Sequence, residues 1–158
     1  MQWKNSSKEI TSELESWLYD KKIISYAMFD STFAEEYEYY QKNTYEGKIR
    51  DLIKVVFLDH ILIGYMVLNY YTYDSIYEVG INPIIINPKY QNQGYGKQVL
   101  DSCVHEIEEI VDGRVDQIFA TIDKSNLASI HLFESVGFYK KKEEGNFYSY
   151  YFDCKKKQ

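Results

Sequence analysis

The segment Ile84–Lys97, which reads IIINPKYQNQGYGK, decides the fold of this chain. Its three leading isoleucines are β-branched and apolar, and they favour a strand in the protein interior. Pro88 has no N–H group to donate to a strand ladder, so we expect regular pairing to end close to it. The segment therefore predicts a buried strand, then a turn, then the start of a helix.

The helix is predicted to begin at the glycines of this segment. Apolar residues follow at helical spacing, at Leu100, Cys103, Val104, Ile107 and Val111. The first turn of a helix has N–H groups without partners inside the helix and carries a partial positive charge. Gly94 and Gly96 lack a Cβ, so a ligand can approach those N–H groups closely. The pattern indicates a site for a phosphate or pyrophosphate group.

Two familiar nucleotide-binding motifs do not fit this segment. The dinucleotide-binding motif G-x-G-x-x-G needs a third glycine where the chain has Val99. The P-loop motif needs a glycine, and then a serine or threonine, at the positions of Gln91 and Gln98. Taken alone, the two glycines are also typical of an ordinary turn before a surface helix.

A second motif, Asn126–Phe138, reads NLASIHLFESVGF. Together the two motifs resemble the GNAT superfamily, the N-acyltransferases that use acyl-coenzyme A. That family has Q/R-x-x-G-x-G/A after a strand, matched here by Gln91, Gly94 and Gly96. Further along it has N-x-x-A/S-x-x-L-Y/F-x-x-x-G-F, matched here by Asn126, Ser129, Leu132, Phe133, Gly137 and Phe138. The resemblance covers roughly Lys54 to the C-terminus.

The length of the chain suits one domain over residues 1–158. The resemblance implies an α/β (α+β) fold: a mixed, mainly antiparallel central sheet of six to seven strands with helices on both faces. Hydrophobic periodicity agrees with that layout. It predicts helices near residues 6–18, from 31 or 32 to about 40, and at 94–111 and 126–136. It predicts strands at 23–29, 52–58, 61–71, 77–86, 115–122, 138–142 and 147–152.

The resemblance also implies where coenzyme A binds. In the family the pyrophosphate lies on the amides of the glycine-containing turn, and the pantetheine arm pairs like an extra strand with the strand before it. The cofactor-binding residues expected here are Ile84, Ile85, Ile86, Gln91, Asn92, Gln93, Gly94, Tyr95, Gly96, Lys97, Asn126, Ser129 and Phe133. The Ile86 N–H is the expected donor to the thioester oxygen. Pro83 is expected at a bulge or an edge position, which is consistent with the place where neighbouring strands separate in the family.

Acetyl transfer to an amine requires a neutral nitrogen, and a proton helps the thiolate to leave. Glu78, on the strand that leads to Ile84, is the expected general base, although it is also typical of a solvated carboxylate on a strand face. The family often has a tyrosine at the position of Phe133 to protonate the sulfur, and phenylalanine has no proton to give. Ser129 and Tyr139 are the expected substitutes, and a water or an unassisted thiolate stays open.

The composition of the chain limits the classes of partner that we expect it to bind. The formal net charge of −6 argues against nucleic acid as the main partner. It is compatible with a cationic acceptor, although many enzymes are this acidic for solubility alone. No apolar segment is long enough to span a bilayer, and the N-terminus has no signal-peptide pattern, so we expect a cytoplasmic protein without a membrane partner. Cys103 reads as a core thiol. No group of Cys and His residues has ligand spacing, so no metal is expected.

The expected function is the direct transfer of an acetyl group from acetyl-CoA to a primary amine, either a small molecule or a peptide N-terminus. The alternative is a GNAT-like module that binds acyl-CoA without turnover. A homodimer is compatible with both the transferase and the non-catalytic binding module. An acceptor pocket for a cation is hypothesised from rings and carboxylates at Glu35, Glu36, Tyr37, Glu38, Tyr39, Tyr40, Tyr70, Tyr71 and Tyr73. Tyrosines on strands are also ordinary half-buried residues.

Overall fold

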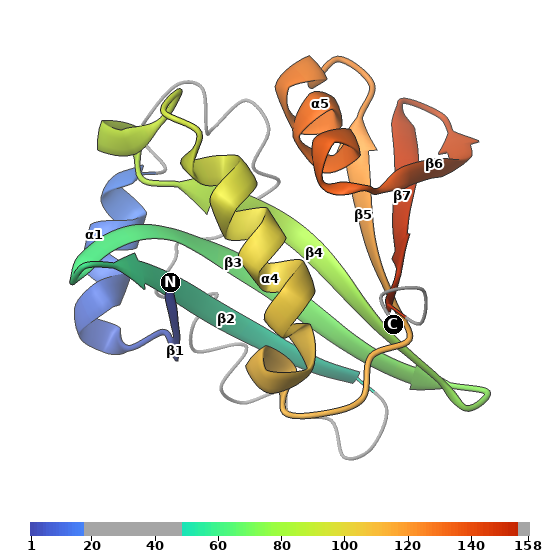
Figure 1. The fold of residues 1–158 in the computed structure, drawn as a ribbon, viewed down its shortest axis with the longest axis horizontal. Coiled ribbons are helices and arrows are strands. Elements are labelled where there is room, and N and C mark those ends of the chain that lie inside the picture. Colours follow the sequence, from blue (N-terminus) through green and yellow to red (C-terminus); the bar gives the residue numbers. More distant parts are fainter. Residues whose placement is uncertain (18–48, 155–158) are drawn as a thin grey trace.

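A computed structural model describes residues 1–17 and 49–154. Within these ranges seven strands form one sheet in the order β1-β2-β3-β4-β5-β7-β6 (Figure 1). β4 and β5 are parallel, and the other neighbouring strands pair antiparallel. The expected mixed, mainly antiparallel sheet is therefore confirmed.

The strands lie close to the predicted segments. Their bounds are β2 (Ile49–Leu58), β3 (Ile61–Tyr73), β4 (Ile76–Ile86), β5 (Gln117–Asp123), β6 (Tyr139–Glu144) and β7 (Phe147–Asp153). Asp59 and His60 form the turn between β2 and β3, both with positive φ, as a two-residue hairpin turn of this kind requires. The predicted strand at 23–29 and the predicted helix ending near residue 40 lie outside the described residues.

Two short elements were not predicted. β1 (Gln2–Asn5) pairs antiparallel with β2, and η1 (Pro88–Tyr90) is a single turn of 3-10 helix between β4 and the following helix. β1 has no apolar alternation of its own, so its pairing depends on the exposed edge that β2 offers. η1 follows from the Asn87-Pro88 dipeptide. The proline ring restricts the backbone of Pro88 itself and also disfavours a helical conformation at Asn87, so the chain turns here.

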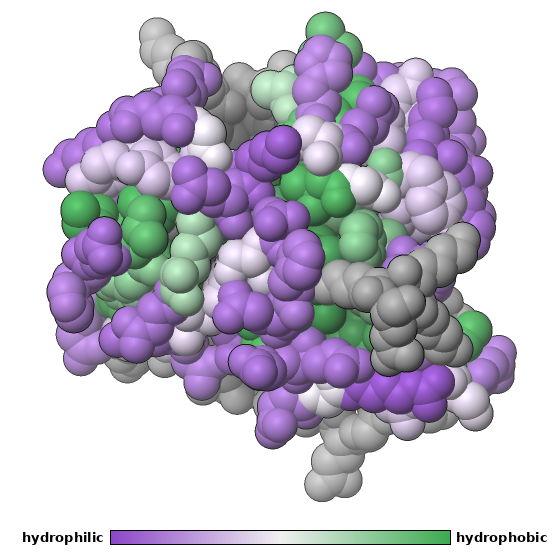
Figure 2. All heavy atoms as spheres, viewed as in Figure 1, coloured by the Kyte–Doolittle hydropathy of each residue, from purple (hydrophilic) through white to green (hydrophobic). Residues whose placement is uncertain are grey.

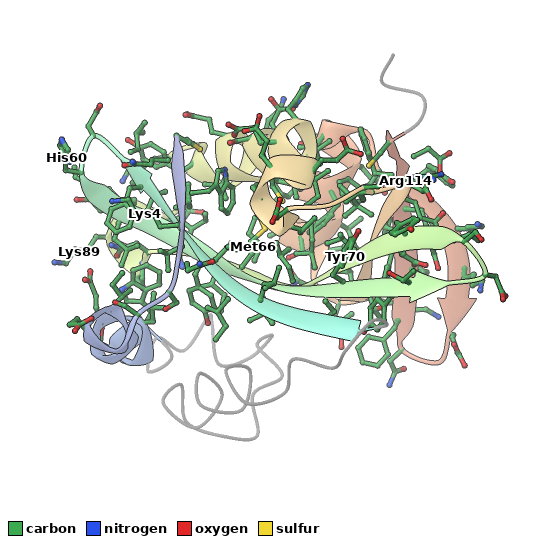
Figure 3. The ribbon with its side chains drawn as sticks, turned by 90° about the horizontal axis from the view of Figure 1, so that it is seen from below. Lys4, His60, Met66, Tyr70, Lys89 and Arg114 are labelled. Atoms are coloured by element: carbon green, nitrogen blue, oxygen red, sulfur yellow. The ribbon has the colours of Figure 1, made fainter. Side chains whose placement is uncertain are left out.

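Helices cover both faces of the sheet, as expected. α4 (Tyr95–Val111) and α5 (Leu127–Val136) share one apolar core, and α1 (Lys8–Trp17) contributes to a second. Alternation along β3 divides the two cores, since Met66 packs in the first and Tyr65 in the second. Figure 3 shows α1 and α4 on opposite sides of the sheet, with Met66 between the sheet and α4.

No helix within the described ranges is long and apolar enough to cross a membrane.

Candidate functional site

β4 and β5 pair over a short stretch and then separate. Glu78, Val79 and Gly80 pair with Gln117, Ile118 and Phe119. Beyond Gly80, β4 continues to Ile86 with β3 as its one strand partner among residues 1–17 and 49–154. Figure 1 shows the two strands diverging toward the end of β4 that leads into η1 and α4. Within the part of the chain that the structure describes, the edge of β4 on the β5 side is therefore open from Ile81 to Ile86, and an extended ligand can pair with it.

The ladder between β3 and β4 fixes which backbone groups face this opening. The Asn87 N–H donates to the Ile63 carbonyl at 2.7 Å, so these residues form a hydrogen-bonded pair. Because such pairs alternate in an antiparallel ladder, the N–H and C=O of Ile84 and Ile86 point away from β3, into the opening. The side chain of Gln91 agrees with this direction, since its Nε2 donates to the Ile86 carbonyl at 3.1 Å.

β4 carries an irregularity next to the opening. Met66 pairs with Ile84 and Leu68 pairs with Ile81, so two steps along β3 match three steps along β4. The extra residue falls at Asn82-Pro83, where proline has no N–H to give to the ladder. A bulge or an edge position was predicted for this proline, and a bulge bends its strand. The irregularity thus lies where β4 has parted from β5.

Asn87 anchors the turn between β4 and α4, although sequence reasoning did not select it as a site residue. Its side chain is buried, its Nδ2 donates to the Leu62 carbonyl at 3.0 Å, and its Oδ1 accepts from the Lys89 N–H at 3.1 Å. Its carbonyl accepts from the Tyr90 N–H at 2.8 Å. The turn is therefore held rigidly against β3. The Asn-Pro dipeptide was the available signal.

The start of α4 has the features of an anion site. Gly94 is the N-cap with φ of 84°, and no described side chain caps the helix there. Asn92 also has a positive φ of 61°. The first turn holds no acidic residue and includes the exposed Lys97. A cation is unfavourable at this end of a helix dipole, so the local charge is complementary to an anion from outside.

Three elements meet beside this turn. A Cβ on Gly96 would lie 3.6 Å from Leu132 of α5 and 3.8 Å from Ile86 of β4. Figure 2 shows apolar atoms at the surface between α4 and α5, over the region where β4 and β5 separate. Asn126 caps α5, because its Oδ1 accepts from the Ser129 N–H at 3.2 Å. One wall of the opening is thus apolar and built from α5.

The structure separates the candidate proton donors. Phe133 is buried in the core, with its ring edge-on to Phe138 at 4.9 Å between centroids. Ser129 lies one turn earlier on α5 and is half-buried. Tyr139 lies on the edge strand β6, and its hydroxyl is 3.4 Å from both carboxylate oxygens of Asp153. Ser129 and Tyr139 therefore do not converge on one position.

Glu78 is buried, not solvated, with 5% of its surface exposed. Its neighbour Val79 packs in the α4 core, so the Glu78 side chain lies on the other face of the sheet. It belongs to the last stretch in which β4 pairs with β5, directly before the opening. Burial, together with the negative charge of Glu78, raises the pKa of Tyr151. The carboxylate is thus close to the aromatic residues of that face.

Within residues 1–17 and 49–154, no group of His, Cys, Asp and Glu residues is arranged to hold a metal ion. Cys103 is buried, as predicted, and neither Cys103 nor Cys154 forms a disulfide within the described residues.

A model of the acetyltransferase (GNAT) family matches residues 11–138. No curated protein matches the sequence. A solved structure of spermidine N-acetyltransferase from Vibrio cholerae, in complex with CoA and spermine, has a TM-score of 0.77 at 18% identity, over 98% of this chain and 96% of that one. A dodecameric structure of spermidine N-acetyltransferase from the same organism, in an intermediate state, has a TM-score of 0.68 at 17% identity, over 98% and 94% of the two chains.

Proposed function

The chain belongs to the acetyltransferase (GNAT) family, and we propose that it transfers an acetyl group from acetyl-CoA directly to a primary amine. Acetyl-CoA-dependent N-acetylation is the activity of that family, and acetyl-CoA is its cosubstrate. The observation that carries the proposal is the open edge of β4, which leads within one short turn to the uncapped start of α4. An extended arm that ends in a pyrophosphate matches those two features in that order.

The residues present fit this cosubstrate. The pantetheine amides pair with the backbone of Ile84 and Ile86, whose polar groups face the opening, while Ile85 packs under α1. The pyrophosphate binds the amides of Gln91–Lys97. A Cβ on Gly94 would have no atom of the described residues within 4 Å, which leaves room there for a phosphate. Asn126, Ser129 and Phe133 lie on α5, along the apolar wall.

The proposed reaction needs a base for the amine, a donor to the carbonyl oxygen and a source of a proton for the thiolate. Glu78, directly or through a water, takes the proton from the ammonium of the acceptor. The neutral nitrogen then attacks the thioester carbon, and the Ile86 N–H stabilises the negative charge on the carbonyl oxygen. The C–S bond breaks as the C–N bond forms. The nitrogen gives up its second proton to water, and the thiolate takes a proton from water or from Ser129, whose hydroxyl is then reprotonated by water. Tyr139 is less suited as donor, because its hydroxyl is directed to Asp153.

The acceptor is a small-molecule amine in this proposal. The neighbours from Vibrio cholerae are spermidine N-acetyltransferases, which supports that class over a peptide N-terminus. The buried carboxylate of Glu78 and the net charge of −6 support a cationic acceptor.

Thiol release from acetyl-CoA across monoamines, polyamines, aminoglycosides and peptide N-termini tests the activity. We expect turnover with at least one small amine. Turnover with peptides alone would overturn the acceptor class. Binding of acetyl-CoA without turnover for any acceptor would favour the alternative, a module that binds acyl-CoA, for which Phe133 in the family's tyrosine position is the one supporting feature.

Calorimetry with acetyl-CoA tests the binding site. Gly94→Glu places a carboxylate where the pyrophosphate is proposed to lie. Gly145→Glu is a matched control, because Gly145 also has a positive φ, 58°, and open space around it, but lies in the turn between β6 and β7. We expect the wild type and Gly145→Glu to bind equally, and Gly94→Glu to bind at least about tenfold more weakly. Equal binding by all three proteins would remove the pyrophosphate from this turn.

A further inference from the structure

Three aromatic rings form a continuous row across the face of the sheet opposite α4. The ring of Phe119 on β5 lies 6.0 Å from Tyr71 of β3 and 6.0 Å from Tyr151 of β7, measured between centroids. Phe119 reaches Tyr71 across β4 because Gly80 stands between them. A Cβ on Gly80 would lie 2.7 Å from the Phe119 ring. We refer to Tyr71, Phe119 and Tyr151 as the aromatic row.

A carboxylate lies at each end of the aromatic row. Glu78 is the register partner of Tyr71 and is buried beside the opening between β4 and β5. Asp153 lies two residues after Tyr151 on β7, so the two side chains are on the same face. Its carboxylate accepts from the Tyr139 hydroxyl. Glu78 and Asp153 pair with Gln117 from its two sides, so their backbones are two strand spacings apart, roughly 10 Å.

One ammonium group of the chain already lies on this surface. Lys141, next to the register irregularity of β6, places its Nζ 4.7 Å from the centroid of the Tyr151 ring. The row thus accepts a primary ammonium by a cation–π contact. This contact is independent of the two carboxylates and points to the same class of ligand.

We propose that the aromatic row is the acceptor site for an alkylamine that carries a second positive charge. The proposal rests on the proposed function and names the substrate class of the same site. The reacting amine lies at Glu78, where its proton is removed. The methylene chain lies on the rings of Phe119 and Tyr151. The second ammonium binds Asp153 and displaces the ammonium of Lys141 from Tyr151.

Two substitutions with opposite expected effects test the assignment. 1,4-diaminobutane and n-butylamine are compared by kcat/KM, because they have the same chain length but differ by one ammonium. Asp153→Asn should lower the preference for the diamine about fivefold, through KM, as expected for loss of one partly exposed ion pair. Lys141→Gln should raise that preference, because a competing cation is removed. A gain of this kind is not produced by damage to the fold.

Matched controls carry the same charge changes elsewhere. Asp101→Asn removes an exposed carboxylate from α4, and Lys142→Gln removes an exposed ammonium from β6. Both should keep the wild-type preference. The inference is overturned if the wild type does not prefer the diamine, or if Asp153→Asn and Lys141→Gln change the preference no more than their controls.

The experiments distinguish a failure of the aromatic-row proposal from a failure of the proposed N-acetyltransferase function. Equal turnover of both amines would reject the aromatic row and leave the N-acetyltransferase intact. Absence of turnover with both amines, while other amines are acetylated, would also reject only the row. Binding of acetyl-CoA without transfer to any amine would reject the proposed function itself.

Discussion

Phe133 occupies the position at which many members of the family carry a tyrosine. The mechanism of this chain therefore differs from theirs by one hydroxyl group, the one expected to protonate the sulfur. We expect Phe133→Tyr to raise kcat about tenfold with little change in KM for acetyl-CoA, because general acids contribute on the order of a hundredfold or more and a substitute is already present. Steady-state kinetics with a saturating amine measures this. An unchanged kcat would mean that protonation of the sulfur does not limit the reaction.

Ser129 is the proposed substitute donor, and a double-mutant comparison isolates its contribution. Ser129→Ala should lower kcat about tenfold in the wild type and much less in the Phe133→Tyr background, where the new hydroxyl takes over. Equal losses in both backgrounds would exclude Ser129 as the donor. The Asn126 cap of α5 accepts from the backbone of Ser129, so the substitution leaves that bond in place.

Tyr150 makes a partly buried hydrogen bond whose effect on stability depends on pH. It is 1% exposed, and its hydroxyl donates to Glu134 at 2.8 Å. Burial and this carboxylate raise the pKa of Tyr150 from 10.0 to about 12. The folded state therefore holds the proton more tightly than the unfolded chain, and the stabilisation is complete below about pH 10 and lost as the pH rises through about 12.

We therefore expect Tyr150→Phe to lower the free energy of unfolding by about 1–2 kcal/mol at pH 8. The difference from the wild type should shrink between about pH 10 and pH 12. Urea unfolding at several pH values measures it, with Tyr148→Phe, a half-buried tyrosine of the same strand, as the control for loss of a hydroxyl. A difference that stays constant up to pH 12 would contradict the assignment.

At the scale of elements, the close approach of β3 to β4 shapes the proposed cofactor strand. A Cβ on Gly64 would lie 2.7 Å from the backbone oxygen of Ile85. We expect Gly64→Ala to push the two strands apart, to lower the free energy of unfolding by about 1–3 kcal/mol and to weaken acetyl-CoA binding. Chemical unfolding and calorimetry measure the two effects.

Gly96→Ala separates folding from binding. The new Cβ would make only ordinary contacts, at 3.6 Å or more, and alanine is favourable in a helix. The variant should therefore be as stable as the wild type, yet bind acetyl-CoA more weakly, since the methyl group obstructs the approach to the amides. If Gly64→Ala proved as stable as Gly96→Ala, the close strand contact would have no energetic role.

The elements that the sequence predicts well are those whose own periodicity is strong. β3, β4 and α4 lie within a few residues of their predicted bounds, because alternation and helical spacing are local properties. β1 was missed, since its pairing with β2 depends on a partner far along the chain. Pro83 was expected at a bulge or an edge position, because a missing N–H is visible in the sequence, and a register shift lies at this proline.

At the scale of the whole molecule, the site was predictable only in part. The turn of Gln91–Lys97 and the cap at Asn126 lie within single segments and are recognisable there. The aromatic row is not, because Tyr71, Phe119 and Tyr151 come together only through the registers of four strands. The burial of Glu78 is likewise a tertiary property. The hypothesised pocket residues between 35 and 40 lie outside the described residues.

The proposed site also predicts how the whole chain responds to its cosubstrate. The open strand edge, the turn and α5 are joined only in the folded state, so acetyl-CoA should bind that state and not the unfolded chain. At a concentration one hundred times Kd, this adds about 2.7 kcal/mol to the free energy of unfolding. For a chain of 158 residues we expect Tm to rise by roughly 5–10 °C. Thermal unfolding with increasing acetyl-CoA measures the rise. It should be unchanged in Gly145→Glu and fall by about half or more in Gly94→Glu, whereas an undiminished rise in Gly94→Glu would place the cosubstrate elsewhere on the fold.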